Sequence, residues 1–271
     1  MTTTSPTIAR RVLGTRFRLA REARKLTRAR AGAELGMSGQ TIQRIEEGTQ
    51  GTKKLQVNGL VDLYAIPKMQ ASELHRLALD GNKRGWWQPY KKGLMPELPL
   101  FLETEQEASH IFTLETEYIP GLLQTPEYLK AVQALWPIVP ETASAVRSLR
   151  TQRQDRLFDR EELPRMTFLI GCAALHYLDA MPTAKEGQLD RLKEVAAIPE
   201  VDVRIMNHPH AAMSGSFNIL TPGPPLPGEP FVFIDALDGG RYVEDRDVVS
   251  LYERTFEAVR EIATPIEEFL T

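Results

Sequence analysis

Residues 26–48 read LTRARAGAELGMSGQTIQRIEEG, and this stretch predicts two short helices joined by a tight turn. Thr27 is a suitable N-cap for the first helix, because its side-chain oxygen accepts a hydrogen bond from the first turn. Gly36 ends that helix, since glycine tolerates the left-handed conformation that follows many helices. Ser38 caps the second helix and Gly48 ends it. The pattern is that of a helix-turn-helix motif.

The second of these helices has one apolar and one polar side. Ile42 and Ile45 are three residues apart, so they share a face, and we expect that face to be buried. Gln40, Gln43 and Arg44 then point outwards. Glutamine and arginine are the side chains that bind adenine and guanine edges through two hydrogen bonds in the major groove of DNA. The predicted base-reading residues are Gln40, Thr41, Gln43 and Arg44.

Basic residues lie where a helix disfavours them. Arg28 and Arg30 occupy the first turn of the first helix, where the helix dipole is unfavourable to positive charge. Their position is explained if this end of the helix faces the DNA backbone and the arginines bind phosphate. Lys53 and Lys54 follow the second helix and are suited to the same role. The predicted phosphate-binding residues are Thr27, Arg28, Arg30, Lys53 and Lys54.

The charges of the chain are segregated along its length. Residues 1–92 contain 18 Lys and Arg against 7 Asp and Glu, whereas residues 93–271 contain 15 basic and 29 acidic residues. This asymmetry between the two parts is typical of a nucleic-acid-binding arm joined to a domain of another kind.

Glycine and proline interrupt the chain between these two parts, and the interruption predicts a linker. We expect a mixed fold, in which an all-α helix-turn-helix domain precedes an α+β domain with a sheet and surrounding helices. The predicted domains are residues 1–80 for the helix-turn-helix DNA-binding domain, 81–100 for the linker, and 101–271 for an α+β domain that serves regulation, dimerisation or partner binding.

Hydrophobic spacing predicts the elements on either side of the linker. Helices are expected at residues 10–24, 55–66, 102–117, 142–159, 184–197 and 245–262, with another that begins at Pro126 and ends before Pro137. Strands are expected at residues 166–170, 201–206, 217–220 and 231–235.

Residues 119–128, IPGLLQTPEY, combine a turn signal with two apolar residues and a helix start. Thr125 is placed to cap the helix that Pro126 begins. Leu122 and Leu123 serve either core packing or a partner-binding surface. Packing is the favoured interpretation, because apolar side chains are more often interior.

The run from Leu26 to Gly48 resembles the XRE family of phage-repressor-like regulators, whose usual pattern is close to L-T-Q-x-x-L-A-x-x-L-G-V-S-x-x-T-I-S-R-I-E-x-G. The resemblance implies a lambda-repressor-like fold and sequence-specific DNA binding. Arg28 replaces the usual glutamine, and Gly32 replaces the usual alanine at about 1 kcal/mol of helix propensity. Gly39 lacks the side chain that often makes the first base contact, so the other outward residues carry the readout.

The second half of the chain is similar to a domain that follows an XRE-type head in many actinobacterial regulators. The segments that carry this similarity are Gly85–Trp87, Glu117–Tyr128, Val201–Ile205 and Tyr242–Asp245. The resemblance implies a regulator encoded beside a small partner protein, in an antitoxin-like arrangement.

No residues suggest catalysis or a metal site. His208-Pro209-His210 has no further ligand at zinc-site spacing, and Ser214-Gly215-Ser216 lacks the frame of a nucleophile elbow. We therefore expect a protein that is not an enzyme and has no cofactor. A single cysteine, Cys172, and the lack of an apolar run of about 18 residues favour the cytoplasm over a membrane.

Together these patterns predict a cytoplasmic regulator of transcription that binds double-stranded DNA as a homodimer through its repressor-type head. Two alternatives stay open. In one, the protein is antitoxin-like and chiefly binds a small partner protein, while DNA binding serves autoregulation. In the other, the second domain is a small-molecule sensor.

Overall fold

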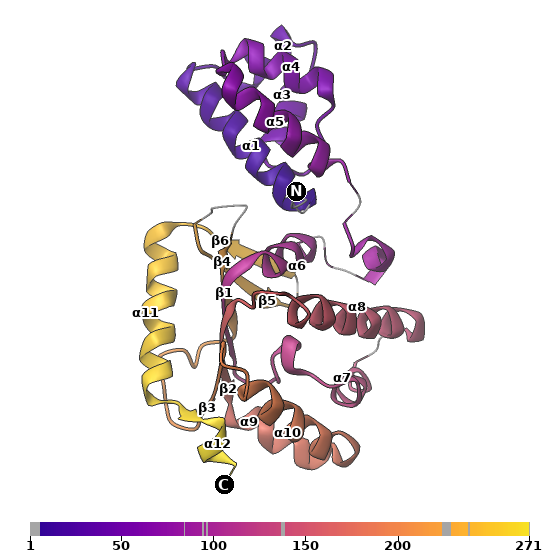
Figure 1. The fold of residues 1–271 in the computed structure, drawn as a ribbon, viewed down its shortest axis with the longest axis vertical. Coiled ribbons are helices and arrows are strands. Elements are labelled where there is room, and N and C mark those ends of the chain that lie inside the picture. The colour runs from indigo at the N-terminus through magenta and orange to yellow at the C-terminus, as the bar shows by residue number, and fades with distance from the viewer. Residues whose placement is uncertain are drawn as a thin grey trace. The chain divides into compact units, whose positions relative to one another are not determined.

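The chain folds into two compact units, residues 1–88 and 89–271 (Figure 1). In the computed structural model, the described residues are 6–83, 85–93, 95, 97–136, 139–223, 229–237 and 239–270.

Every regular element among the described residues of the N-terminal unit is a helix. Its helices are α1 (Pro6–Ala23), α2 (Arg28–Glu34), α3 (Gly39–Glu46), α4 (Lys54–Leu63) and α5 (Lys68–Gly81). One apolar core joins them, with Leu13 and Phe17 of α1 packed among Ile42 of α3, Leu60 of α4 and Leu77 of α5. The predicted helices of this unit are confirmed, with ends displaced by a few residues.

Helix α5 was not predicted, although Leu74, Leu77 and Ala78 lie at helical spacing and are buried in the core. Its N-cap is Pro67, whose side chain makes no capping hydrogen bond. The usual start signal of a polar capping residue is therefore missing from the sequence.

The C-terminal unit is built on a seven-stranded mixed sheet with the order β6-β5-β4-β1-β2-β3-β7. Strands β1, β2 and β3 are parallel, and every other neighbouring pair is antiparallel. The strands are β1 (Ala108–Glu115), β2 (Arg165–Gly171), β3 (Val201–Met206), β4 (Phe217–Pro222), β5 (Phe231–Ala236), β6 (Gly239–Val243) and β7 (Thr264–Pro265).

Helices cover both faces of this sheet, with α11 on one face and α8 and α10 on the other (Figure 1). The helices of the unit are α6 (Leu98–Gln106), α7 (Pro126–Gln133), α8 (Pro140–Phe158), α9 (Cys172–His176), α10 (Pro182–Ala196), α11 (Arg246–Ile262) and α12 (Ile266–Phe269). Short 3-10 helices occur at η1 (Gln88–Gly93), η2 (Gly121–Leu123) and η3 (Tyr177–Ala180). The predicted class, an all-α head followed by an α+β domain, is confirmed.

The helix predicted over residues 102–117 is wrong in its second half. Helix α6 ends at Gln106, and residues 108–115 form β1, the central strand of the sheet. Ala108, Ile111 and Leu114 are buried at intervals of three, which imitates a helical stripe. Pairing with β2 on one side and β4 on the other overrides that local signal.

The four predicted strands and the remaining helices of the C-terminal unit are confirmed. Strand β6 was not predicted, because its sequence GGRYV begins with two glycines, which are rare in strands.

The segment from Ile119 to Gln124, with Tyr128, is packed inside the unit. Leu122 and Leu123 are buried, which supports the packing interpretation over a partner-binding surface. Gln154 Nε2 donates to the carbonyl oxygens of Gly121 and Gln124, each at 2.9 Å. The hydroxyl of Thr125 accepts a hydrogen bond from the backbone N–H of Tyr128 at 3.2 Å, as the predicted cap requires.

Charged side chains meet between the sheet and α8. Burial raises the pKa of Glu115 to about 7, and the negative charge of Asp235 adds to the rise, while Ser216 and the guanidinium of Arg150 oppose it. Burial lowers the pKa of Arg150 to about 10. This face of the sheet therefore holds a carboxyl group that ionises near neutral pH.

We predict that Glu115 makes the stability of the chain depend on pH. Below pH 4.5 the group is protonated in both states. Between pH 4.5 and 7 it ionises only when unfolded, so the free energy of unfolding falls as pH rises through the folded pKa, by about 3 kcal/mol. Glu115→Gln removes this loss, and urea unfolding of both proteins at pH 5 and pH 8 measures it.

The matched control is Glu261→Gln, an exposed glutamate on α11. Its unfolding free energy should follow the wild type at both pH values. Equal differences between Glu115→Gln and wild type at pH 5 and pH 8 would contradict the prediction.

Candidate nucleic-acid interface

Helices α2 and α3 form the predicted helix-turn-helix. Gly36 adopts a φ of +63°, the left-handed conformation expected at the end of α2, and the N–H of Met37 donates back to the carbonyl oxygen of Gly32 at 2.8 Å. Ser38 has the extended backbone of an N-cap, and its hydroxyl accepts a hydrogen bond from the N–H of Thr41 at 3.0 Å. The turn and both predicted caps are thus present.

Two glycines let the helices of this motif approach closely. A Cβ atom on Gly32 would lie 2.6 Å from the carbonyl oxygen of Met37, and one on Gly39 would lie 3.2 Å from the Cα atom of Ala29. The first distance is far inside van der Waals contact. Glycine has a lower helix propensity than alanine, but the turn leaves no room for a methyl group at position 32. Sterics therefore explain why glycine is found there.

Helix α3 presents its polar side to solvent. Ile42 and Ile45 are 1% and 2% exposed, while Gln40, Gln43 and Arg44 are exposed. The structure thus brings the three outward residues together on the side away from the core. Gln43 Nε2 donates to Glu47 Oε1 at 2.8 Å, which orients its amide along the helix.

Thr41 differs from the other predicted base-reading residues. Its side chain is partly buried, and its hydroxyl is 2.9 Å from the hydroxyl of Ser38. It belongs to the cap of α3 as well as to the predicted reading set.

The predicted phosphate-binding residues lie at the N-termini of two helices. The hydroxyl of Thr27 accepts from the N–H of Arg30 at 3.1 Å, and the guanidinium of Arg30 pairs with Glu34 at 2.7 Å while its side chain is 68% exposed. Lys53 is the N-cap residue of α4 and Lys54 its first residue, and both are exposed.

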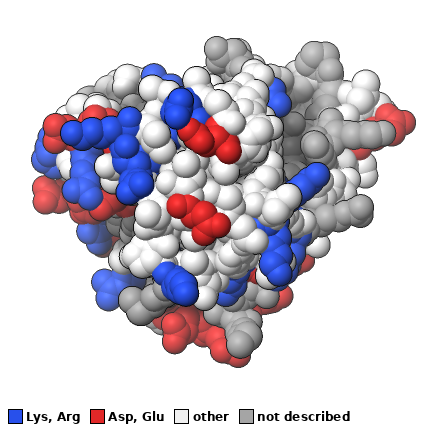
Figure 2. All heavy atoms as spheres, turned by 90° about the horizontal axis from the view of Figure 1, so that it is seen from above, with Lys and Arg blue, Asp and Glu red and all other residues white. Residues whose placement is uncertain are grey.

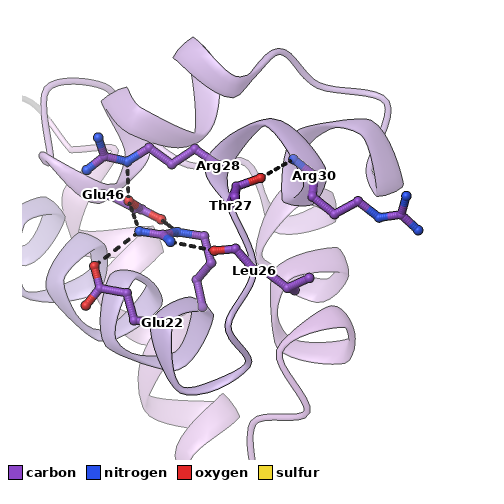
Figure 3. Close-up of polar contacts among 7 residues, drawn as sticks. Glu22, Leu26, Thr27, Arg28, Arg30 and Glu46 are labelled. Carbon is purple, nitrogen blue, oxygen red and sulfur yellow. Dashed lines mark hydrogen bonds and ion pairs between the residues drawn. The ribbon is translucent and has the colours of Figure 1, made fainter.

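Arg28 has a second partner that sequence reasoning missed. Its Nε donates to Glu46 Oε2 at 2.8 Å, and the other oxygen of Glu46 accepts from Arg21 Nε at 2.5 Å (Figure 3). Arg21 also donates to the carbonyl oxygen of Leu26 at 2.7 Å. One carboxylate thereby joins α1, α2 and α3. We call Arg21, Arg28 and Glu46 the charge cluster.

Two members of the charge cluster are buried inside the unit. Glu46 is 5% exposed and Arg21 is 7% exposed, and the hydrogen bond to Glu46 raises the pKa of Arg21. Burial, reinforced by the negative charge of Glu46, raises the pKa of Tyr64 to about 12. The sequence did contain a signal that Glu46 is buried. It lies four residues after Ile42, and this spacing places it on the buried side of α3.

Basic side chains gather in groups on the face drawn in Figure 2, with acidic side chains beside some of them. Within the described residues, no three His, Cys, Asp or Glu side chains are placed to hold a metal ion. No helix in that part of the chain is long and apolar enough to cross a membrane.

Comparison with known families divides the chain in two. A model described as a helix-turn-helix domain matches residues 12–74, and a model described as a domain of unknown function, DUF5753, matches residues 98–269. No curated protein sequence and no solved structure matches the chain. The second match covers more than half of the sequence, and the first includes every predicted DNA-contacting residue.

We predict that Gly32→Ala destabilises the protein, although alanine is the better helix former by about 1 kcal/mol. The added methyl group would collide with the carbonyl oxygen of Met37, and overpacking of this kind typically costs about 1–3 kcal/mol. Thermal unfolding measures the change. Gly187→Ala in α10, where a Cβ meets no atom within 4 Å, is the control and should stabilise the protein slightly.

We also predict that Glu46→Gln destabilises the protein by about 3–5 kcal/mol, because the buried guanidinium of Arg21 loses its buried counter-charge and keeps only the exposed Glu22 at 3.3 Å. Glu47→Gln, the exposed neighbour on the same helix, should change stability by less than about 0.5 kcal/mol. Urea unfolding of the two variants separates them. Equal unfolding free energies for the two variants would show that the charge cluster does not stabilise the packing of α1, α2 and α3.

Proposed function

The chain belongs to the DUF5753 family, here joined to a helix-turn-helix domain, and we propose that it is a sequence-specific regulator of transcription that binds DNA as a homodimer. The observation that carries the proposal is the exposed face of α3. Gln40, Gln43 and Arg44 stand on it together, opposite a buried face that holds the helix in the core.

Helix α3 is the recognition helix in this proposal. Arg44 donates two hydrogen bonds to guanine, and the amides of Gln40 and Gln43 pair with adenine edges in the major groove. Gly39, at the start of the helix, has no side chain to contribute. Specificity therefore rests on residues 40, 43 and 44, with Thr41 beside them.

The N-termini of α2 and α4 bind the DNA backbone. Arg30 and Lys53 are exposed there, next to backbone N–H groups that favour anions. Arg28 binds phosphate with the part of its guanidinium that Glu46 does not hold, since its side chain is 40% exposed. Lys54 and Thr27 complete the set.

Dimerisation follows from the reading geometry. A recognition helix reaches only a few base pairs, and repressor-type heads gain affinity by placing two such helices about 34 Å apart on one side of the duplex. The C-terminal unit, rich in acidic residues, supplies the contact between copies or receives a signal. Its negative charge keeps it from competing for DNA. The proposal contains no catalytic step, and the single cysteine suits a reducing compartment such as the cytoplasm.

A second candidate function is the binding of a small partner protein. Leu135, Trp136 and Val139 are 74%, 48% and 59% exposed around the start of α8. Large exposed apolar side chains close together in the chain are typical of an interaction surface. Co-purification of the wild type, but not of Trp136→Glu, with the protein encoded beside this chain would support this role.

We predict that Arg44→Ala weakens binding to the operator by about 1–3 kcal/mol and leaves binding to unrelated DNA unchanged, because only a base contact is lost. Lys54→Ala should weaken binding to both DNAs alike and reduce the salt dependence by about one unit of slope. Fluorescence anisotropy with DNA from upstream of the chain's own gene, at two salt concentrations, measures both effects.

The control for this experiment is Arg254→Ala, an exposed arginine of α11 in the other unit. It should bind both DNAs as the wild type does. If Arg44→Ala keeps full affinity for a DNA that the wild type binds specifically, α3 is not the recognition helix.

A further inference from the structure

A cavity of about 450 Å³ lies in the C-terminal unit, on the side of the sheet that α11 covers. Its walls come from the segment before β4, from the neighbouring strands β5 and β6, and from the first half of α11. The lining residues that the argument uses are Ser216, Ile234, Arg241, Val248, Leu251 and Tyr252. The volume is in the range of pockets that hold one small molecule, roughly 300–1,000 Å³.

The cavity exists because α11 carries two apolar stripes. Val249, Phe256 and Val259 form the first stripe, and they pack into the buried cluster on the sheet. Val248 and Leu251 form the second stripe, which lines the cavity, and their side chains are 39% and 55% exposed. An apolar body placed there would remove this surface from water, which is favourable at about 25 cal/mol per Å².

The polar groups of the cavity favour an anion. Among the described residues that line it, none is acidic and Arg241 is the one basic side chain. Arg241 is exposed, and no hydrogen bond or ion pair joins its guanidinium to another residue in the described part of the chain. Burial of a carboxylate against it would form a charge-assisted pair with two hydrogen bonds.

Tyr252 adds a hydroxyl group to the same wall. Its ring packs edge-on against Phe217, with centroids 4.8 Å apart, which fixes the side chain. Within the described residues its hydroxyl has no hydrogen-bond partner, so it is available to a ligand oxygen. The Ser216 hydroxyl, by contrast, already accepts from the N–H of Thr116 at 3.1 Å.

We propose that this cavity binds a small carboxylic acid with an apolar body. Its carboxylate pairs with Arg241 and accepts a hydrogen bond from Tyr252, and its apolar part lies against Ile234, Val248 and Leu251. This site is where the C-terminal unit of the proposed regulator would receive its signal. The regulatory role of the site therefore rests on the proposed function.

The test is calorimetric titration of the full chain with octanoate, and with 1-octanol and acetate as matched probes. Octanoate should bind one site per chain, at least about tenfold more tightly than 1-octanol, which lacks the charge. Acetate should not bind measurably, because it lacks the apolar body. Equal affinity for octanoate and 1-octanol, or no saturable binding of octanoate at millimolar concentration, overturns the proposal.

Two variants of the full chain test whether octanoate binds in this cavity. Arg241→Met keeps an unbranched side chain but removes the charge, and it should lower octanoate affinity to the level of 1-octanol. Arg254→Met, an arginine of α11 outside the cavity lining, should bind octanoate as the wild type does. Unchanged affinity in Arg241→Met, or an equal loss in both variants, overturns the assignment.

This titration contains no DNA, so its failure is distinct from failure of the proposed DNA binding. If the chain binds octanoate but no operator, the ligand site is supported and its regulatory role is contradicted. Operator binding with no octanoate binding would leave the regulator standing without this site.

Discussion

The N-terminal unit depends on one buried carboxylate. Glu46 lies at the end of α3 and is shared between Arg21 of α1 and Arg28 of α2. A buried carboxylate is costly unless opposite charges surround it, so Glu46 requires the arginines that α1 and α2 bring to it. Because Ile42, Ile45 and Glu46 all turn inwards, the remaining face of α3 is left to solvent. The interaction that stabilises the fold thereby sets the surface available to DNA.

In the proposed function, the charge cluster also gives Arg28 two roles. Its guanidinium holds Glu46 from one side and is partly exposed on the other. An arginine anchored in this way loses less conformational freedom when it binds a phosphate than a free side chain would. In the proposed function, the contact of α2 with the DNA backbone and the packing of α3 are thus connected through a single side chain.

The sheet of the C-terminal unit separates two environments. On the side of α8, Glu115 lies among charged neighbours and has a pKa near neutrality. On the side of α11, Phe112, Leu114 and Phe256 form an apolar layer. The alternation of side chains along β1 produces this division, since successive residues of a strand point to opposite faces. An apolar ligand cavity beside α11 is consistent with the environment of that face.

Local signals in the sequence were enough for the helix-turn-helix and the exposed polar face of α3. Caps, glycines and the spacing of Ile42 and Ile45 act over a few residues and are visible in any short window. They could not reveal β1, whose place in the sheet comes from strands about 55 and 110 residues further along the chain. The charge cluster and the cavity were hidden for the same reason. Both join residues that only the folded chain brings together, so tertiary packing decided them.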